Sequence, residues 1–296
     1  MSVLSAPHFH DEAEAYKFVE ARIWNHGPVC PHCKARDRIS KMQGKSTRIG
    51  AYKCYHCRKP FTVKVGTIFE ASHIPMRIWL QGIFLLASSK KGMSSNQLHR
   101  ALGVTLKSAW FMSQRIREAM RSGSLSPMGG GGGIVEIDET FIGKKDGVVG
   151  GGIYHKHAVL TLLSRGGEAR SFHIDRANAD NIIPIIRANL AAEAKVVTDD
   201  AGYYRNLDKE FLHAFVNHSA GQYGRGEIHT NTIEGYYSIF KRGMKGTYQH
   251  CSEKHLHRYL AEFDFRYSNR VRLGVNDEQR AERALKGVVG KRLTYK

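Results

Sequence analysis

The chain has 296 residues, enough for two domains with substantial cores, and its hydrophobic content of 42% is typical of a globular protein. No stretch is apolar over the length of a bilayer-spanning helix, and the polar, acidic start does not fit a signal or transit peptide, so we expect a cytoplasmic protein and no membrane partner. The net charge is +18, of which residues 1–128 contribute +13. Such a balance favours a polyanionic partner, most simply nucleic acid; a basic surface that serves solubility alone is the alternative.

Residues 1–27 form an N-terminal segment in which a helix is predicted over residues 11–24. Four cysteines that follow it form two C-x2-C pairs. The pairs read C-P-H-C and C-Y-H-C, with twenty residues between them. This spacing is typical of a structural zinc ribbon, in which four thiolates close a tetrahedral shell and leave no position for catalysis. Unrelated cysteines are the alternative, and disulfides are disfavoured in a reducing cytosol. The predicted ribbon spans residues 28–66, and its zinc ligands are Cys30, Cys33, Cys54 and Cys57.

Residues 75–122 are predicted to be helical. Within them, residues 94–120 read as a helix, a break at Gly103 and a second helix that begins near Thr105. This is the pattern of a helix-turn-helix, which DNA-binding proteins use but plain helical hairpins share. The basic residues that we expect to contact DNA from the second helix are Lys107, Arg115 and Arg117.

Five consecutive glycines occupy residues 129–133. Such a run has great backbone freedom, so we interpret residues 123–133 as a glycine-rich linker or hinge. It is not a phosphate-binding loop, because no G-K-[ST] follows it.

An α/β domain is predicted to follow over residues 134–270. Three segments read as antiparallel strands: the first alternates apolar and acidic residues, and the other two are joined by a Gly-Gly turn. A helix with a proline, a further strand and two more helices are predicted to follow. This order predicts a layered sheet covered by helices. Residues 271–296 are expected to form a basic tail.

Three carboxylates fall where the predicted elements can bring them together. Asp138 is predicted to end the apolar first strand, Asp199 ends the later strand, and Glu234 lies early in a covering helix. Converging carboxylate oxygens suit Mg2+ or Mn2+, and two such ions can activate an attacking oxygen and stabilise a leaving oxygen on a phosphodiester. Glu136 and Glu139 rival Asp138 as the ligand; strand alternation places residues 136 and 138 on one face and 139 on the other, and the position of Asp138 at the predicted strand end favours it. Asp200 rivals Asp199, and Glu234 has the alternative of an ordinary surface residue.

Taken together, these blocks resemble a family of bacterial insertion-sequence transposases that carry an N-terminal zinc ribbon and a DDE-type catalytic domain (insertion-sequence family fifteen-ninety-five, ISXO-like group). The matching segments run in order over nearly the whole chain and are CPHC, CYHC, LGVTLKSAWFMSQRIREAM, VEIDETFIGKK, VVTDDAGY and HTNTIEGYYSIFKRGMKGTYQHCSEKHLHRYLAEFDFRYSNR.

The resemblance implies a ribonuclease-H-like core with a catalytic triad of Asp138, Asp199 and Glu234. It also implies two catalytic cofactor ions there, Mg2+ or Mn2+. Thirty-four residues separate Asp199 from Glu234, a spacing typical of such enzymes. Some branches use asparagine as the third ligand, and Asn231 lies one helical turn before Glu234, so either residue could reach the metals. Basic residues around the site suit a phosphate backbone and are Lys144, Lys145, Lys241 and Arg242.

The function expected from this resemblance is transposition. The enzyme would bind terminal inverted repeats in double-stranded DNA, cleave at the element ends and join the freed 3′-hydroxyl to target DNA. Because two ends must be joined, at least a dimer is expected on DNA, in the bacterial cytoplasm and associated with the nucleoid. A DNA-binding regulator that no longer cuts, and a nuclease of similar fold, are the alternatives.

Overall fold

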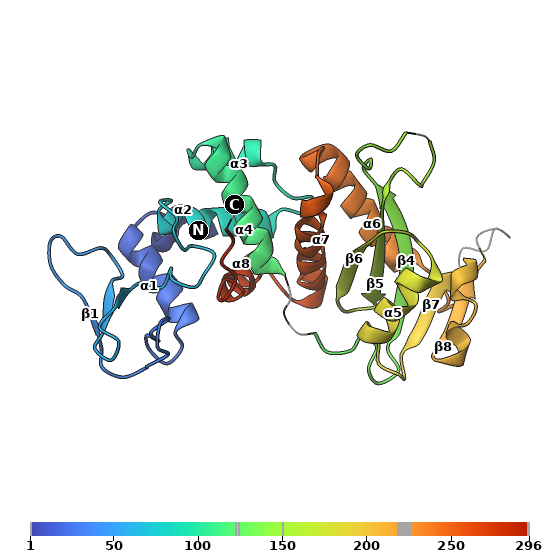
Figure 1. Ribbon diagram of the computed structural model, residues 1–296, viewed down its shortest axis with the longest axis horizontal. Coiled ribbons are helices and arrows are strands. Elements are labelled where there is room, and N and C mark those ends of the chain that lie inside the picture. The colour runs from blue at the N-terminus through green and yellow to red at the C-terminus, as the bar shows by residue number, and fades with distance from the viewer. Residues whose placement is uncertain (1, 122, 124, 150, 218–225, 295–296) are drawn as a thin grey trace. The chain divides into compact units, whose positions relative to one another are not determined.

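The computed structural model describes residues 2–121, 123, 125–149, 151–217 and 226–294 (Figure 1). Contacts divide the chain into two compact units. Unit 1 comprises Met1–Ser89, Met93–Arg121 and Val275–Lys296, and unit 2 comprises Lys90–Gly92 and Ser122–Gly274. Small parts of the predicted linker and tail, at residues 124 and 295–296, lie outside the described residues. No described helix is both long and apolar enough to cross a bilayer.

Unit 1 begins with helix α1 and a small antiparallel sheet. Asp11 caps α1 (Glu12–Ile23) by accepting the Glu14 N–H at 2.8 Å, which satisfies a backbone donor that has no partner within the helix. The sheet has the order β1-β2-β3, and its strands are β1 (Ile39–Lys41), β2 (Tyr52–Cys54) and β3 (Pro60–Phe61). The predicted helix and hairpins are therefore present.

Three helices follow in unit 1, α2 (Met76–Ser88), α3 (Ser95–Leu102) and α4 (Leu106–Met120). Ser94 and Gln97 form a reciprocal capping box at the start of α3, and Gly103 ends it with a left-handed backbone (φ 64°). Thr105 then caps α4 by accepting the Ser108 N–H at 3.2 Å. These caps confirm the helix, glycine turn and second helix predicted from the sequence.

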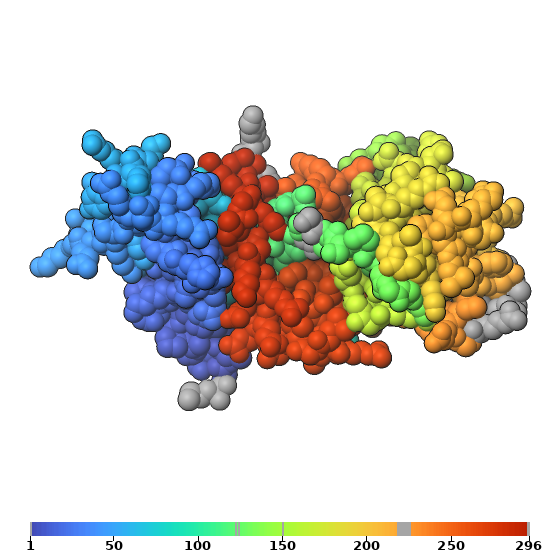
Figure 2. All heavy atoms as spheres, turned by 90° about the horizontal axis from the view of Figure 1, so that it is seen from below, coloured from blue at the N-terminus to red at the C-terminus, as the bar shows by residue number. Residues whose placement is uncertain are grey.

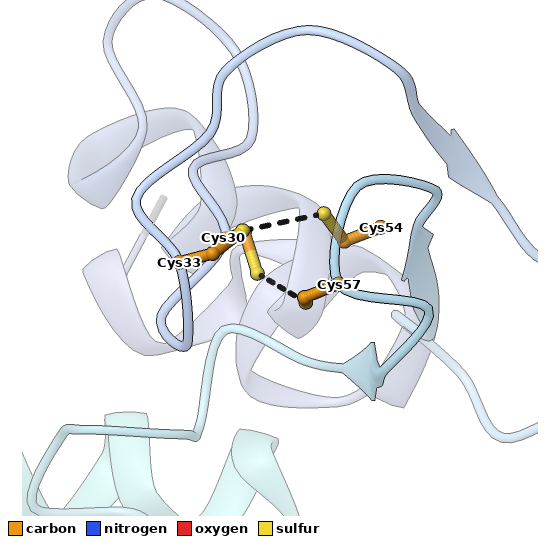
Figure 3. Close-up of side chains that lie close together, drawn as sticks. All are labelled: Cys30, Cys33, Cys54 and Cys57. Atoms are coloured by element: carbon orange, nitrogen blue, oxygen red, sulfur yellow. Dashed lines mark hydrogen bonds between the residues drawn. The ribbon is translucent and has the colours of Figure 1, made fainter.

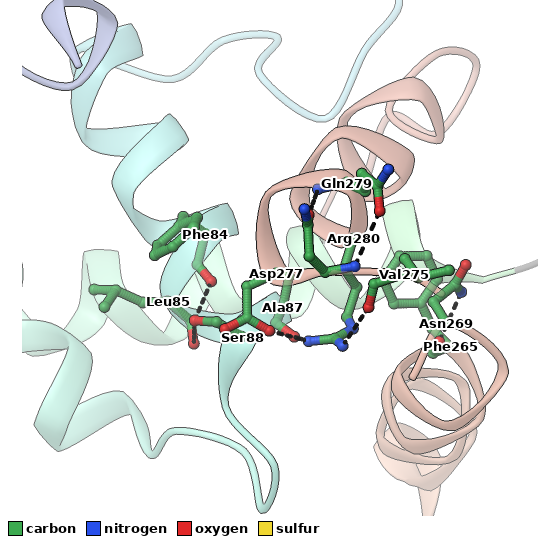
Figure 4. A network of polar contacts seen from close by, with 11 residues as sticks. Phe84, Leu85, Ala87, Ser88, Phe265, Asn269, Val275, Asp277, Gln279 and Arg280 are labelled. Carbon is green, nitrogen blue, oxygen red and sulfur yellow. Dashed lines mark hydrogen bonds and ion pairs between the residues drawn. The ribbon is translucent and has the colours of Figure 1, made fainter. Parts of the chain in front are cut away.

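The segment predicted as a basic tail instead contains an ordered helix, α8 (Asp277–Lys286), which belongs to unit 1. Arg280, only 6% exposed, donates to the carbonyl of Ala87 at the end of α2 and pairs with Asp277 at 2.6 Å (Figure 4). In the space-filling view the C-terminal segment, red, lies beside the N-terminal one, blue (Figure 2). The tail prediction is therefore wrong. Helix α8 buries only Arg280, Ala284 and Leu285, and the many charged residues around them gave no sign of a packed face.

Unit 2 is built on a five-stranded mixed sheet with the order β6-β5-β4-β7-β8. The first three strands are antiparallel, β7 runs parallel to β4, and β8 runs parallel to β7. This order confirms the predicted α/β, ribonuclease-H-like class. The strands are β4 (Ile134–Ile142), β5 (His157–Ser164), β6 (Ala169–Ile174), β7 (Lys195–Asp199) and β8 (Leu212–Val216).

Helices cover both faces of this sheet, and β4 contributes to both cores by strict alternation. Val135 and Ile137 join the core beneath α5 (Ala179–Asn189), whereas Ile142 joins the core beneath the other two helices. Those helices are α6 (Asn231–Gly243), which continues into a π-helical turn (Met244–Tyr248), and α7 (Glu253–Ser268). Side chains at even positions of β4, including Glu136 and Asp138, therefore face α6.

The glycine run is a packed turn of unit 2 and not a linker. Gly129 is buried with a φ of 75°, and its carbonyl accepts the Gly133 N–H at 3.0 Å. The Gly133 carbonyl in turn accepts the Lys195 N–H at 3.1 Å, which ties the run to the start of β7. The linker prediction is wrong here because composition shows the freedom of a glycine run but not the contacts that remove it.

We expect Gly129→Ala to destabilise unit 2 clearly. A Cβ there would lie 2.5 Å from the Cβ of Ala194, on a left-handed backbone. The backbone costs about 1–2 kcal/mol and the overpacking about 1–3 kcal/mol more. Gly131→Ala is the matched control, because its φ is 67° but nothing lies within 4 Å of the added Cβ. Urea unfolding measures both, and equal losses in the two variants would contradict the packed role of Gly129.

Candidate functional site

The four cysteines of the ribbon converge on one point from two tight turns, or knuckles, each of which carries one C-x2-C pair (Figure 3). Their sulfurs all lie within 4.8 Å of one another, and the Sγ–Sγ distances are 3.6 Å for Cys30–Cys57 and 3.6 Å for Cys33–Cys54. These separations are far too long for disulfides, and all four cysteines are free thiols. A tetrahedral zinc shell with Zn–S bonds of about 2.3 Å places its sulfurs about 3.8 Å apart. The donor set and its geometry therefore fit a structural zinc ion.

Aromatic side chains support the knuckles from one side. Trp24 packs edge-on against Tyr52 and Phe61, with ring centroids 5.3 Å and 5.9 Å apart, and this cluster contacts Cys30 and Cys54. The four cysteines and this aromatic wall hold the ribbon together, because so small a segment has little other apolar surface to bury.

The three basic residues of α4 that were predicted to contact DNA differ in their exposure. Lys107 is exposed in the first turn, as DNA contact requires. Arg115 is 3% exposed, and its guanidinium donates to the carbonyls of Glu70 and Leu293 at 2.7 and 3.0 Å. Arg117 is 1% exposed and donates to Ser113 Oγ at 3.0 Å. Both arginines hold unit 1 together, so the prediction that they contact DNA is wrong.

In unit 2, the parallel pairing of β4 with β7 brings two of the predicted carboxylates to the same level of the sheet. Glu136 lies opposite Val197, so two residues further along Asp138 and Asp199 reach the same level of adjacent strands. Both side chains are half-buried. Asp138 Oδ1 accepts the Glu139 N–H at 2.7 Å, and Asp199 Oδ1 accepts the Ala201 N–H at 3.1 Å.

Asp138 lies in the middle of the nine-residue strand β4 and not at its end as predicted, because the strand continues through Ile142. Two contacts fasten α6, which carries Glu234, over this middle part of β4. Glu136 Oε2 accepts the Ile233 N–H at 2.8 Å, in the first turn of α6 where backbone donors lack helical partners. One turn further on, the Tyr237 hydroxyl donates to the backbone carbonyl of Asp138 at 2.5 Å. Glu234 itself is exposed, and its neighbour Asn231 is exposed at the first position of the helix.

The carboxylates influence one another's charge. Burial, followed by the negative charges of Glu139 and Asp199 and more weakly that of Glu234, raises the pKa of Asp138 to about 8. A carboxylate in this position is short of positive charge, which is the electrostatic setting in which a divalent cation binds. The charges of Asp199 and Glu234 thus reach Asp138, although the three side chains are not among the described groups whose ligand atoms lie within 4.8 Å of one another.

Glu139 is a further acidic residue of β4. The alternation of the strand predicted that its side chain lies on the face opposite to that of Asp138, and the structure places it on that face. Its carboxylate accepts hydrogen bonds from Tyr203 at 2.6 Å and from Tyr204, both in the turn just after β7. Burial raises its pKa to about 7 although the two hydroxyls lower it. Glu139 therefore joins β4 to the turn that follows Asp199.

A buried ion pair beside α6 was also not predicted. Glu136 is fully buried and pairs with Arg165 at 2.6 Å. Arg165 also donates to the carbonyls of Glu227 and His229, at 2.6 and 2.7 Å, in the segment that leads into α6. This arrangement fixes the entry to α6 and hence the position of Glu234.

The remaining basic residues lie on two segments of unit 2. Lys144 is exposed, and Lys145 is half-buried with its Nζ bonded to the Asp175 carbonyl at 3.1 Å. On α6, Lys241 and Arg242 are exposed, and Lys241 Nζ lies 5.9 Å from the Tyr237 ring centroid. Lys144, Lys241 and Arg242 are thus the exposed cations of this set, and the Arg242 guanidinium also donates to the carbonyl and hydroxyl of Ser238 at 3.0 and 2.9 Å.

Two family models match parts of this chain. The model of the ISXO2-like transposase domain matches residues 131–268, and that of the transposase zinc-ribbon domain matches residues 10–60. A protein described as an uncharacterised protein in transposable element ISH50 of Halobacterium salinarum is 27% identical over 279 residues, covering 87% of this chain and 91% of that protein.

A solved structure, a pre-cleavage Mos1 transpososome, is similar over 66% of this chain and 70% of its own, at 11% identity and a TM-score of 0.29. A TM-score this low does not by itself establish a shared arrangement. The two matched domains cover the four cysteines and all three carboxylates.

Proposed function

Because the chain carries the zinc-ribbon and ISXO2-like transposase domains of one insertion-sequence family, we propose that it is a transposase that cleaves DNA at the ends of its element and joins those ends to target DNA. The observation that best supports this is the alignment of Asp138 with Asp199 on adjacent parallel strands, beneath a helix whose Glu234 adds its charge to the same point.

We propose that Asp138, Asp199 and Glu234 hold divalent metal, with Asn231 as the alternative to Glu234. Two such ions, when bound, activate the attacking oxygen and stabilise the leaving oxygen of a phosphodiester. The residues of the chain supply placement: the strand register sets the first two carboxylates, and the contacts of Glu136 and Tyr237 set the third. Such positioning is the main contribution that a protein makes to phosphoryl transfer.

The DNA contacts follow from exposure and charge. Lys107 on α4 and Lys144, Lys241 and Arg242 in unit 2 are exposed cations that suit phosphate oxygens. Such contacts position the duplex and make binding strongly salt-dependent, because each one releases counterions. Inverted repeats at the element ends would be recognised by the ribbon and helix-turn-helix of unit 1, and joining two ends would need at least a dimer.

A labelled element end incubated with Mg2+ and target DNA tests this function. A transposase cleaves the end and joins it to the target. Binding without cleavage would instead identify a regulator derived from a transposase, and cleavage without joining would identify a nuclease, so either result would overturn the proposal.

We expect Tyr237→Phe to slow cleavage by about 10–100-fold, the usual cost of removing a partner that orients a metal ligand. It deletes the bond from α6 to the Asp138 carbonyl and costs about 1 kcal/mol of stability. Tyr236→Phe is the matched control, since the Tyr236 hydroxyl donates to Asp264 at 2.6 Å, away from the triad. Single-turnover cleavage and urea unfolding are measured together; equal cleavage rates in both variants would rule out this role of Tyr237.

A further inference from the structure

A second group of metal-ligating side chains lies in unit 2, outside the triad. His157 at the start of β5, His173 on β6 and Glu253 in the first turn of α7 each offer a ligand atom, and these atoms lie within 4.8 Å of one another. Among the described residues, the only other group that meets this criterion is the cysteine cluster of the ribbon.

The strand register explains how two histidines meet. His173 pairs with Val159, which joins the core beneath α6 and α7, and His157 lies two residues earlier on the same strand and so on the same face. The two imidazole rings lie 5.3 Å apart between centroids. The first turn of α7 then brings the Glu253 carboxylate to 3.8 Å from His173 Nε2.

His157 is buried and His173 is half-buried, and each has a buried ring nitrogen without a hydrogen-bond partner. His157 is 5% exposed, and its Nδ1 has no hydrogen-bond partner; the same holds for the buried Nε2 of His173. Leaving a buried polar atom without a partner is costly, so it indicates a partner that binds there. Two imidazole nitrogens and a carboxylate are a donor set for zinc and related transition metals, and a poor one for Mg2+.

We propose that His157, His173 and Glu253 bind one divalent transition-metal ion of the zinc class. The glutamate side chain is 56% exposed, which leaves the outer side of the site open to a water ligand. In the β4–β5 register Asp138 lies opposite Thr161, four residues from His157 and about 13 Å away along the strand, so this site is distinct from the triad. The ion joins β5 and β6 to the start of α7 and stabilises unit 2.

Metal binding to the full-length chain tests this site. The ribbon is first loaded with zinc, and Asp199→Asn together with excess Mg2+ keeps zinc out of the triad. We expect equilibrium dialysis against micromolar Zn2+ to show two zinc ions per chain, and His173→Ala and Glu253→Gln to weaken binding of the second ion at least tenfold. His250→Ala is the matched control, because His250 is exposed, precedes Glu253 by three residues and is outside the cluster.

Two further readouts keep the result clear if a variant folds poorly. The second equivalent of Co2+ should add weak d–d absorption without the sulfur charge-transfer band of the ribbon, and zinc should raise the Tm of unit 2 in the parent but not in Glu253→Gln. The proposal fails if the parent binds only one zinc ion, or if His173→Ala and Glu253→Gln bind the second ion as tightly as the parent.

Discussion

Asp138→Asn and Asp199→Asn are each expected to abolish cleavage and joining while the protein still folds and binds element ends. Each substitution removes the charge of a proposed metal ligand but keeps the size of the side chain. Removing even an outer partner of a ligand costs about 10–100-fold, so the loss of a ligand should exceed about 100-fold. Single-turnover cleavage of a labelled end in Mg2+ measures the effect, alongside end binding.

The stability of Asp138→Asn separates chemistry from folding. Burial and neighbouring charges raise the pKa of Asp138 to about 8, above its ordinary value of 3.8. The native state therefore binds a proton more tightly than the unfolded chain, and this side chain makes the fold less stable as the pH rises from about 4 to about 8. A neutral asparagine does not ionise, so it does not lower the stability of the fold at pH 8. The variant should therefore unfold at no lower temperature than the parent at that pH.

Neighbouring variants test the assignment of each ligand. Asp200→Asn should retain cleavage, because Asp199 rather than its neighbour ends β7 and adds its charge to Asp138. Glu234→Gln and Asn231→Ala then identify the third ligand, and we expect the larger loss for Glu234→Gln. Retention of joining in Asp138→Asn would refute the triad.

Cys30→Ser is expected to unfold the ribbon and abolish binding to element ends. Structural zinc contributes about 10–16 kcal/mol to the folding of zinc-finger peptides, which is more than the whole stability of most domains. Cys30 is fully buried against the aromatic cluster, so a serine there loses both a ligand and a packing contact. The sulfur charge-transfer band of bound Co2+, proteolysis of residues 28–66 and a binding assay follow the loss.

Cys251→Ser is the matched control, because Cys251 belongs to unit 2 and not to the ribbon cluster. It should keep the cobalt band, the protease resistance and the binding. A chelator should reproduce the defect of Cys30→Ser in the parent protein, and zinc should reverse it. A Cys30→Ser ribbon that stayed resistant to protease would show that metal does not hold this segment together.

Local signals in the sequence predicted the elements well. The cysteine spacing predicted the ribbon, and Gly103 and Thr105 marked helix ends that the structure shows, because caps depend on residues a few positions apart. The alternation of β4 also assigned Glu136 and Asp138 to one face correctly.

The errors arose where distant contacts decide. Arg115 looked like a DNA contact, but Glu70 and Leu293, remote in the sequence, provide its hydrogen-bond acceptors. Strand β8 was not predicted, because its mixed burial gives no clear alternation. The partners of Glu139 and Glu136 come from loops far along the chain, and no local pattern predicts such pairs.

Helix α8 gives unit 1 an unusual order of assembly. This unit takes its ribbon and helices from the beginning of the chain and its last helix from the end, with all of unit 2 between them. During synthesis, the hydrogen bond from Arg280 to the Ala87 carbonyl at the end of α2 cannot form until almost the whole chain has been made. A product that stops before residue 275 would therefore contain the complete five-stranded sheet of unit 2 but an unfinished N-terminal unit. Early termination would yield chains impaired in that unit and so, on the proposed function, poor at engaging an element end.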